Sequence, residues 1–75
     1  MKFWEMIDRS RKRKALERMR QEYLSKIDKN DERMQCLHQM NWSQQQQINM
    51  VEHITIENRE YQSKADVLEE QIKLL

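Results

Sequence analysis

Residues 37–75 read LHQMNWSQQQQINMVEHITIENREYQSKADVLEEQIKLL, and the spacing of their apolar side chains decides the fold. Steps of three and four residues alternate without a break from Leu37 to Leu75, over more than five heptads. This spacing is typical of a coiled-coil seam, with Leu37 at position a. Apolar residues occupy most of the seam: Leu37, Met40, Val51, Ile54, Tyr61, Ala65, Leu68, Ile72 and Leu75. The polar seam residues are Gln44, Gln47 and Asn58. Asn58 at position a predicts either a buried asparagine that fixes register and oligomeric state or a solvated gap, and for Gln44 and Gln47 the gap is favoured.

A second apolar stripe precedes the seam and is expected to lie on one helical face. It comprises Leu16, Met19, Tyr23, Ile27, Met34 and Leu37. The intervals between these residues are 3, 4, 4, 7 and 3, which is one residue more than a strict heptad repeat allows. Such an extra residue predicts a stutter, at which a coiled coil straightens locally. We therefore predict one packing surface over residues 16–37 and another over residues 37–75.

The composition predicts an all-α protein. The chain of 75 residues contains no glycine and no proline, the two residues on which tight turns usually depend. Apolar residues make up 37% of the chain and charged residues 36%, a balance that suits long exposed helices better than a compact globule. The expected organisation is an aromatic tip and basic arm in residues 1–14, followed by an amphipathic coiled-coil helix in residues 15–75.

The helix could be continuous or broken, and the pattern leaves both open. We favour one long helix because the apolar stripes pass through every polar stretch. The alternative is a helical hairpin that turns near residues 28–31, where Asp28, Asn30 and Asp31 favour turns and caps. A break near 41–43 is the least favoured, although Ser43 and Gln46 match a capping box there.

Several features predict that the chain associates with other helices. A chain this short buries little apolar surface alone, and the single cysteine, Cys36, excludes an internal disulfide. Residues 1–29 carry a net charge of +5 and residues 30–75 a net charge of −4, which favours antiparallel folding or pairing. Ile48 and Met50 widen the apolar stripe, which favours a bundle over a two-stranded zipper.

The N-terminal segment is expected to contact a partner in two ways. Phe3, Trp4 and Ile7, with Met6, form an aromatic tip that we expect to dock into a groove of another protein. A cluster of basic side chains follows: it is either a solvated helical stretch that contacts nothing, or a contact site for an acidic protein, for nucleic-acid phosphates or, least favoured, for an anionic membrane surface. These basic residues are Arg9, Arg11, Lys12, Arg13, Lys14, Arg18 and Arg20.

The order of a basic stretch before heptads resembles that of basic-leucine-zipper proteins. That resemblance implies a small nucleic-acid-binding regulator that dimerises through the 37–75 seam and uses residues 9–20. Residues 9–20 lack the asparagine of that family's basic region, and a stutter separates them from the heptads. We therefore assign the chain to no family and keep the regulator as the alternative function.

No pattern in the sequence predicts catalysis. His38 and His53 lie off the seam, Cys36 and His38 point to nearly opposite helix faces, and no ligand spacing predicts a metal site or a cofactor. The start, Met1–Asp8, is too charged for a secretory signal, and no apolar run is long enough to span a membrane. We expect a non-enzymatic helical assembly subunit in a reducing intracellular compartment, without membrane contact.

Overall fold

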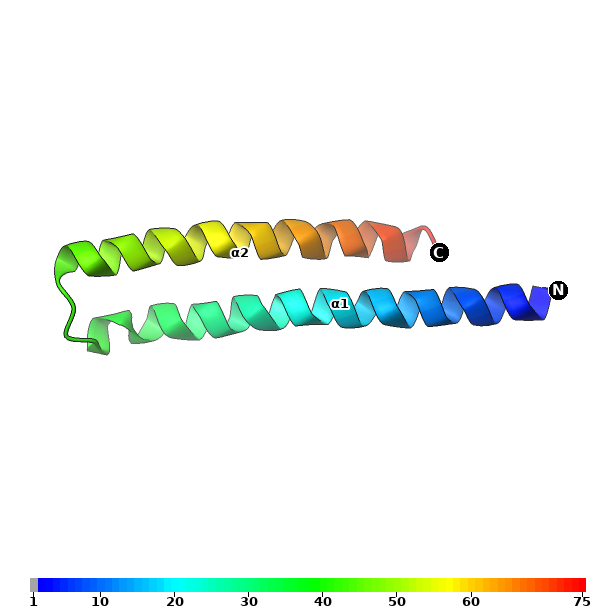
Figure 1. Ribbon diagram of the computed structural model, residues 1–75, viewed down its shortest axis with the longest axis horizontal. Coiled ribbons are helices and arrows are strands. Elements are labelled where there is room, and N and C mark those ends of the chain that lie inside the picture. Colours follow the sequence, from blue (N-terminus) through cyan, green and yellow to red (C-terminus); the bar gives the residue numbers. More distant parts are fainter. Residues whose placement is uncertain (1) are drawn as a thin grey trace.

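The chain folds into two antiparallel helices. The computed structural model describes residues 2–75: helix α1 spans Lys2–Cys36, the short 3₁₀ helix η1 spans Leu37–Gln39, and helix α2 spans Gln44–Lys73 (Figure 1). Its Cα envelope measures 63 × 16 × 10 Å, the shape of a rod. The predicted all-α class is confirmed. The end that holds the turn is called the turn end below, and the other end the open end.

The position of the turn differs from both favoured expectations. The chain reverses between Leu37 and Ser43, so residues 15–75 are not one continuous helix. The proposed turn near residues 28–31 is also wrong, because those residues lie inside α1. The physical reason is that the Asn30 side chain is buried against α2 and hydrogen-bonded there, instead of capping a helix. The least favoured break, near residues 41–43, is the real one.

The turn forms without glycine because it needs no left-handed residue. Among residues 2–75 no residue has a positive φ, and both Met40 and Ser43 adopt extended backbone. Ser43 caps α2: its hydroxyl accepts from the Gln46 amide at 3.2 Å, and the Gln46 side chain accepts from the Ser43 amide at 3.0 Å. A capping box of this kind contributes about 1 kcal/mol to helix stability. The capping box read from the sequence is confirmed.

The hydrophobic core between the helices is small. Only four apolar residues of the described chain are buried: Leu37, Ile54, Ala65 and Leu68. Ile54 is 0% exposed and marks the best-packed point. The net charge of α1 is +4 and that of α2 is −3, so the antiparallel pairing places opposite charges side by side.

The stripe that α1 turns toward α2 follows regular heptads, and the predicted stutter is absent. Arg20 and Asn30 complete the spacing, while Met19 lies beside the stripe and is 46% exposed. Buried and half-buried residues therefore recur at steps of four and three along α1: Leu16, Arg20, Tyr23, Ile27, Asn30, Met34 and Leu37. The stutter was inferred only because Arg20 and Asn30 are polar and were not counted in the stripe.

Candidate functional site

The predicted packing residues fall into two groups in the hairpin. Most are buried or half-buried: Leu16, Tyr23, Ile27, Met34, Leu37, Ile54, Asn58, Tyr61, Ala65, Leu68, Ile72 and Leu75. Met19, Met40 and Val51 are exposed instead. Met40 lies in the turn and Gln44 begins α2, so the first part of the predicted seam is interrupted by the chain reversal. From Gln47 onward every seam residue except Val51 is buried or half-buried.

A polar layer crosses the middle of the hairpin at Asn30, which is 4% exposed. Its Nδ2 donates to Glu57 Oε1 and to Asn58 Oδ1, each at 2.9 Å. Its own Oδ1 accepts from Arg33 Nη1 at 3.3 Å, and Asn58 Nδ2 donates to Asp31 Oδ1 at 3.3 Å. The register-setting role predicted for Asn58 thus depends on Asn30. Asn30 is absent from the predicted packing residues, although its spacing from Ile27 and Met34 places it on their face.

The polar layer changes the acidity of Glu57. The pKa of its carboxyl lies below the ordinary value of 4.5, chiefly because the Asn30 amide donates a hydrogen bond to the charged form. Partial burial opposes this effect, and His53, whose Nε2 lies 3.3 Å from Glu57 Oε2, adds to it. The hairpin therefore binds the charged form of Glu57 more favourably than the unfolded chain does.

Acid is expected to weaken the hairpin through this carboxyl. Because the pKa of Glu57 is lower in the folded chain than in the unfolded chain, its stabilisation is present above pH 4.5. The stabilisation is lost as the pH falls below 4.5 and through the lower pKa of the folded state, where the Glu57 carboxylate becomes protonated. We expect the thermal midpoint measured by circular dichroism to fall on acidification, and the fall to be smaller in Glu57→Gln. An equal fall in both proteins would contradict this prediction.

Two tyrosines and two lysines form the next layer toward the open end. The rings of Tyr23 and Tyr61 lie 6.0 Å apart, one from each helix. The Lys26 ammonium lies 5.4 Å from the centre of the Tyr61 ring, and the Lys64 ammonium 5.7 Å from that of Tyr23. Burial, reinforced by the Glu57 charge, raises the pKa of the Tyr61 hydroxyl. These contacts between lysine and the opposite helix's ring are attractive.

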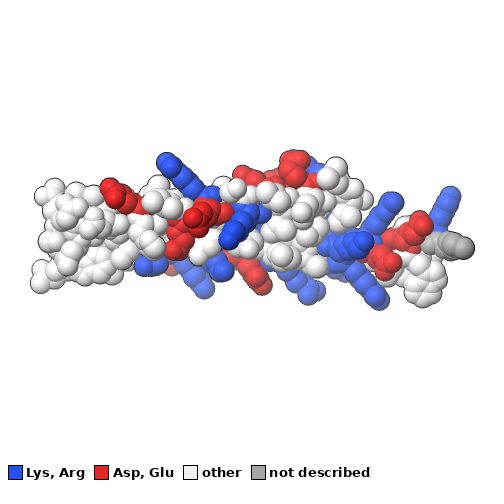
Figure 2. All heavy atoms as spheres, turned by 45° about the horizontal axis from the view of Figure 1, so that its top comes forward, with Lys and Arg blue, Asp and Glu red and all other residues white. Residues whose placement is uncertain are grey.

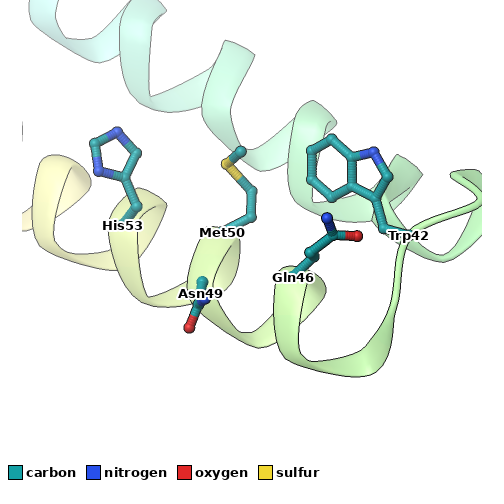
Figure 3. A pocket seen from close by; sticks show the side chains of 5 residues that line it. All are labelled: Trp42, Gln46, Asn49, Met50 and His53. Atoms are coloured by element: carbon teal, nitrogen blue, oxygen red, sulfur yellow. The ribbon is translucent and has the colours of Figure 1, made fainter.

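Among the shallow hollows on the described surface of the hairpin, two carry exposed apolar side chains next to a half-buried or buried one. The turn groove has a volume of about 300 Å³ and is lined by Trp42, Gln46, Asn49, Met50 and His53. Figure 3 shows the indole of Trp42, the thioether of Met50 and the imidazole of His53 along one side of α2. Arg33 of α1 reaches the Met50 sulfur at 3.7 Å. Trp42 is 37% exposed, so an apolar surface is open at this end.

The open-end groove has a volume of about 320 Å³ and lies between the two helices. It is lined by Met19, Tyr23, Ser63, Lys64, Val67 and Leu68. Met19 is 46% and Val67 is 56% exposed, which is high for apolar side chains that flank a buried leucine. Both grooves are open and mainly apolar, so they suit side chains of another helix better than a small polar molecule.

The basic arm and the aromatic tip lie at the open end, where α1 extends past the end of α2 (Figure 1). Phe3 and Trp4 are 65% and 68% exposed and contact each other edge to face, with ring centres 5.7 Å apart. Ile7 is half-buried. The ion pairs among the described residues lie within α2. None of them therefore includes the exposed basic side chains of the arm, which are Arg9, Arg11, Lys12, Arg13, Lys14 and Arg18.

Arg20 differs from the other predicted anion-contacting residues. It lies in the α1 stripe, is half-buried, and its buried Nε atom has no hydrogen-bond partner. Its side chain is therefore partly held between the helices and is less accessible to a partner than Arg18. Figure 2 shows Lys, Arg, Asp and Glu over most of one face of the rod and none at the turn end; in the sequence, Lys and Arg predominate in α1 and Asp and Glu in α2.

Comparison with protein-family models, with curated proteins and with solved structures found no significant match to this chain. Within residues 2–75, no helix is long and apolar enough to cross a membrane. In the same residues, no three His, Cys, Asp or Glu side chains come together as a potential metal site. The function is therefore argued from the exposed surfaces of the hairpin.

Proposed function

We propose that the chain is a non-enzymatic helical assembly or scaffolding subunit that acts by coiled-coil packing against other helices, in a larger complex or as a homo-oligomer. One observation carries the proposal: closing the hairpin buries four apolar residues but leaves eleven large ones exposed. A chain of this size rarely gains enough stability from so small a core. Covering the exposed side chains with further helices supplies what is missing.

The exposed apolar residues gather where a helix can reach them. Met19 and Val67 flank the open-end groove, and Trp42 lines the turn groove. The exposed set is Phe3, Trp4, Met6, Met19, Met40, Trp42, Ile48, Val51, Ile56, Val67 and Leu74. Packing of knobs into such grooves is the way that helices associate in bundles. This arrangement supports partners that are helical proteins, copies of the chain, or both.

The basic arm adds a second contact in this proposal. Its side chains are exposed, enter no ion pair among the described residues, and lie beside the exposed Phe3 and Trp4. An acidic protein surface with an apolar groove matches both features. The aromatic rings would anchor the contact and the charges would orient it.

The second candidate is a small nucleic-acid-binding regulator, which the same free basic residues favour. Phosphate binding weakens steeply with added salt because counterions are released, whereas apolar helix packing does not. Steeply salt-dependent binding of duplex DNA or RNA, lost when Arg11 and Arg13 are replaced by glutamine, would favour this candidate. We also propose that the chain acts without a cofactor, in a reducing compartment that keeps the exposed Cys36 a thiol.

Site-specific photo-crosslinking tests the proposal directly. A photoreactive amino acid at Val67 in the full chain, in the expressing cell, is expected to capture a helical protein or another copy of the chain. The control position is Gln62, which is exposed on α2 about 140° around the helix from Val67: it shares an outer hollow of α2 with Val67 but does not line the open-end groove. Capture at Val67 alone supports helix packing. Equal capture at both positions, or none at either, contradicts it.

A further inference from the structure

We propose that the partner on the groove-bearing side is a second copy of this chain, and that the two hairpins pack face to face with their turn ends together. This inference rests on the proposed function and names the partner for it. The contact side is defined by residues that recur every seven positions: Met19, Lys26 and Arg33 on α1, and Met50, Glu57 and Lys64 on α2. The residues three positions further along adjoin them on the same side: Glu22 and Lys29 on α1, and His53, Glu60 and Val67 on α2. We call this surface the groove flank.

Contacts within the hairpin show which residues of the two helices lie at the same level. Met19 and Val67 line one groove, Tyr23 lies under Lys64, and Lys26 lies over Tyr61. Closer to the turn, Asn30 contacts Glu57, and Arg33 contacts Met50. Each residue of α1 on the groove flank therefore has a known counterpart on α2.

A two-fold axis parallel to the helices places α1 of one copy over α2 of the other. Residues at the same level then face each other across the interface. Met19 meets Val67 of the second copy, so the two exposed apolar side chains of the open-end groove cover each other. The contact is isologous and occurs twice, as a closed dimer requires.

Charges on the groove flank fit the same arrangement. Next to the Met19 level, Glu22 of one copy faces Lys64 of the other. Lys26 then faces the region of Glu60, and Lys29 faces Glu57, so opposite charges meet at successive levels. At the turn end the chain carries no Lys, Arg, Asp or Glu between Arg33 and Glu52, and uncharged surface meets uncharged surface (Figure 2). Complementary charges of this kind select one orientation over others.

The opposite orientation, with the turn ends apart, is disfavoured by the same charges. It would place α1 over α1 of the second copy, with a net charge of +4 on each side, and α2 over α2, with −3 on each side. Met19 would then lie opposite the charged α1 residues near Arg33. The groove flank is close to the size that is needed: the two helices lie side by side over the 30 residues of α2, about 45 Å, so a face 16 Å wide offers roughly 700 Å², near the 800 Å² that each partner of a stable complex usually buries.

Disulfide formation between separate chains tests the arrangement. Two versions of the full chain, both with Cys36→Ser, carry Met19→Cys in one and Val67→Cys in the other. Separate chains are needed because these residues also line one groove within a single hairpin. We expect the disulfide between the Met19→Cys chain and the Val67→Cys chain to form at least tenfold faster than the disulfide between the Met19→Cys chain and a Gln62→Cys chain. We also expect the unsubstituted chain to sediment with the mass of two chains.

The outcomes separate this inference from the proposed function. The dimer is overturned if Met19→Cys forms a disulfide with Val67→Cys no faster than with Gln62→Cys. It is also overturned if Met19→Cys forms a disulfide faster with Arg33→Cys than with Val67→Cys. A monomeric chain whose Val67 photo-crosslinks to a different helical protein overturns the dimer but leaves the proposed function intact. A monomer without any photo-crosslink at Val67 overturns both.

Discussion

Replacing Ile54 by alanine is expected to abolish the cooperative thermal unfolding of the hairpin. Ile54 is 0% exposed and is the largest fully buried side chain among the described residues. Truncation of a buried isoleucine costs about 2–5 kcal/mol, because apolar surface is lost and a cavity remains. Only Leu37, Ala65 and Leu68 share the core with it, so that loss is comparable with the whole stability of a domain this small.

The matched control for Ile54 is Ile56, on the same helix and 59% exposed. Ile56→Ala removes the same atoms from solvent-exposed surface, and we expect a change within about 0.5 kcal/mol. The measurement is helicity by circular dichroism against temperature for both variants. Equal losses in the two variants would contradict the assignment of the core to Ile54.

Replacing Asn30 by leucine is expected to have the second largest effect. The substitution removes the donor to Glu57 and Asn58, and leaves the Asn58 amide oxygen without its partner inside the hairpin. A buried polar group that loses its partner costs about 1–3 kcal/mol. Urea unfolding should show a lower midpoint for Asn30→Leu. Asn49→Leu, at an exposed surface position, should stay within about 0.5 kcal/mol of the unsubstituted chain.

The double variant Asn30→Leu/Asn58→Leu separates stability from register. With both asparagines replaced, no polar group of that pair remains to be satisfied, so the urea midpoint should recover relative to Asn30→Leu. The register lock is lost at the same time. We therefore expect additional oligomeric species in sedimentation. A double variant that is less stable than Asn30→Leu would contradict the role given to this layer.

The helical class and most of the packing face follow from the sequence, because the 3-4 spacing of Tyr61, Ala65 and Leu68 places these residues on one face of a helix. The capping box at Ser43 was equally readable. The turn is predicted near residues 28–31 because Asp28, Asn30 and Asp31 favour turns and caps, whereas the chain reverses where Met40 and Ser43 adopt extended backbone. The 3-4 spacing continues through residues 37–47 only because Met40 and Gln44 happen to keep it.

The polar members of the interface could not be assigned from apolar spacing. Arg20 and Asn30 both occupy regular positions of the α1 stripe, but a polar residue there predicts either a solvated gap or a buried network. Which of the two occurs depends on the residues of the facing helix. Asn30 donates hydrogen bonds to Glu57 and Asn58 on α2, whereas the Nε atom of Arg20 has no hydrogen-bond partner. The grooves likewise depend on how two distant helix faces meet, as Met19 and Val67 do.

We propose that packing against other helices, in the first place a second copy, completes the hairpin. Thermal unfolding of the full chain by circular dichroism, at concentrations from about 1 µM to about 1 mM, is the measurement that decides this. We predict that helicity and the thermal midpoint rise with concentration as two chains associate. A cooperative transition at the same temperature throughout, from a species with the mass of one chain, would contradict the claim.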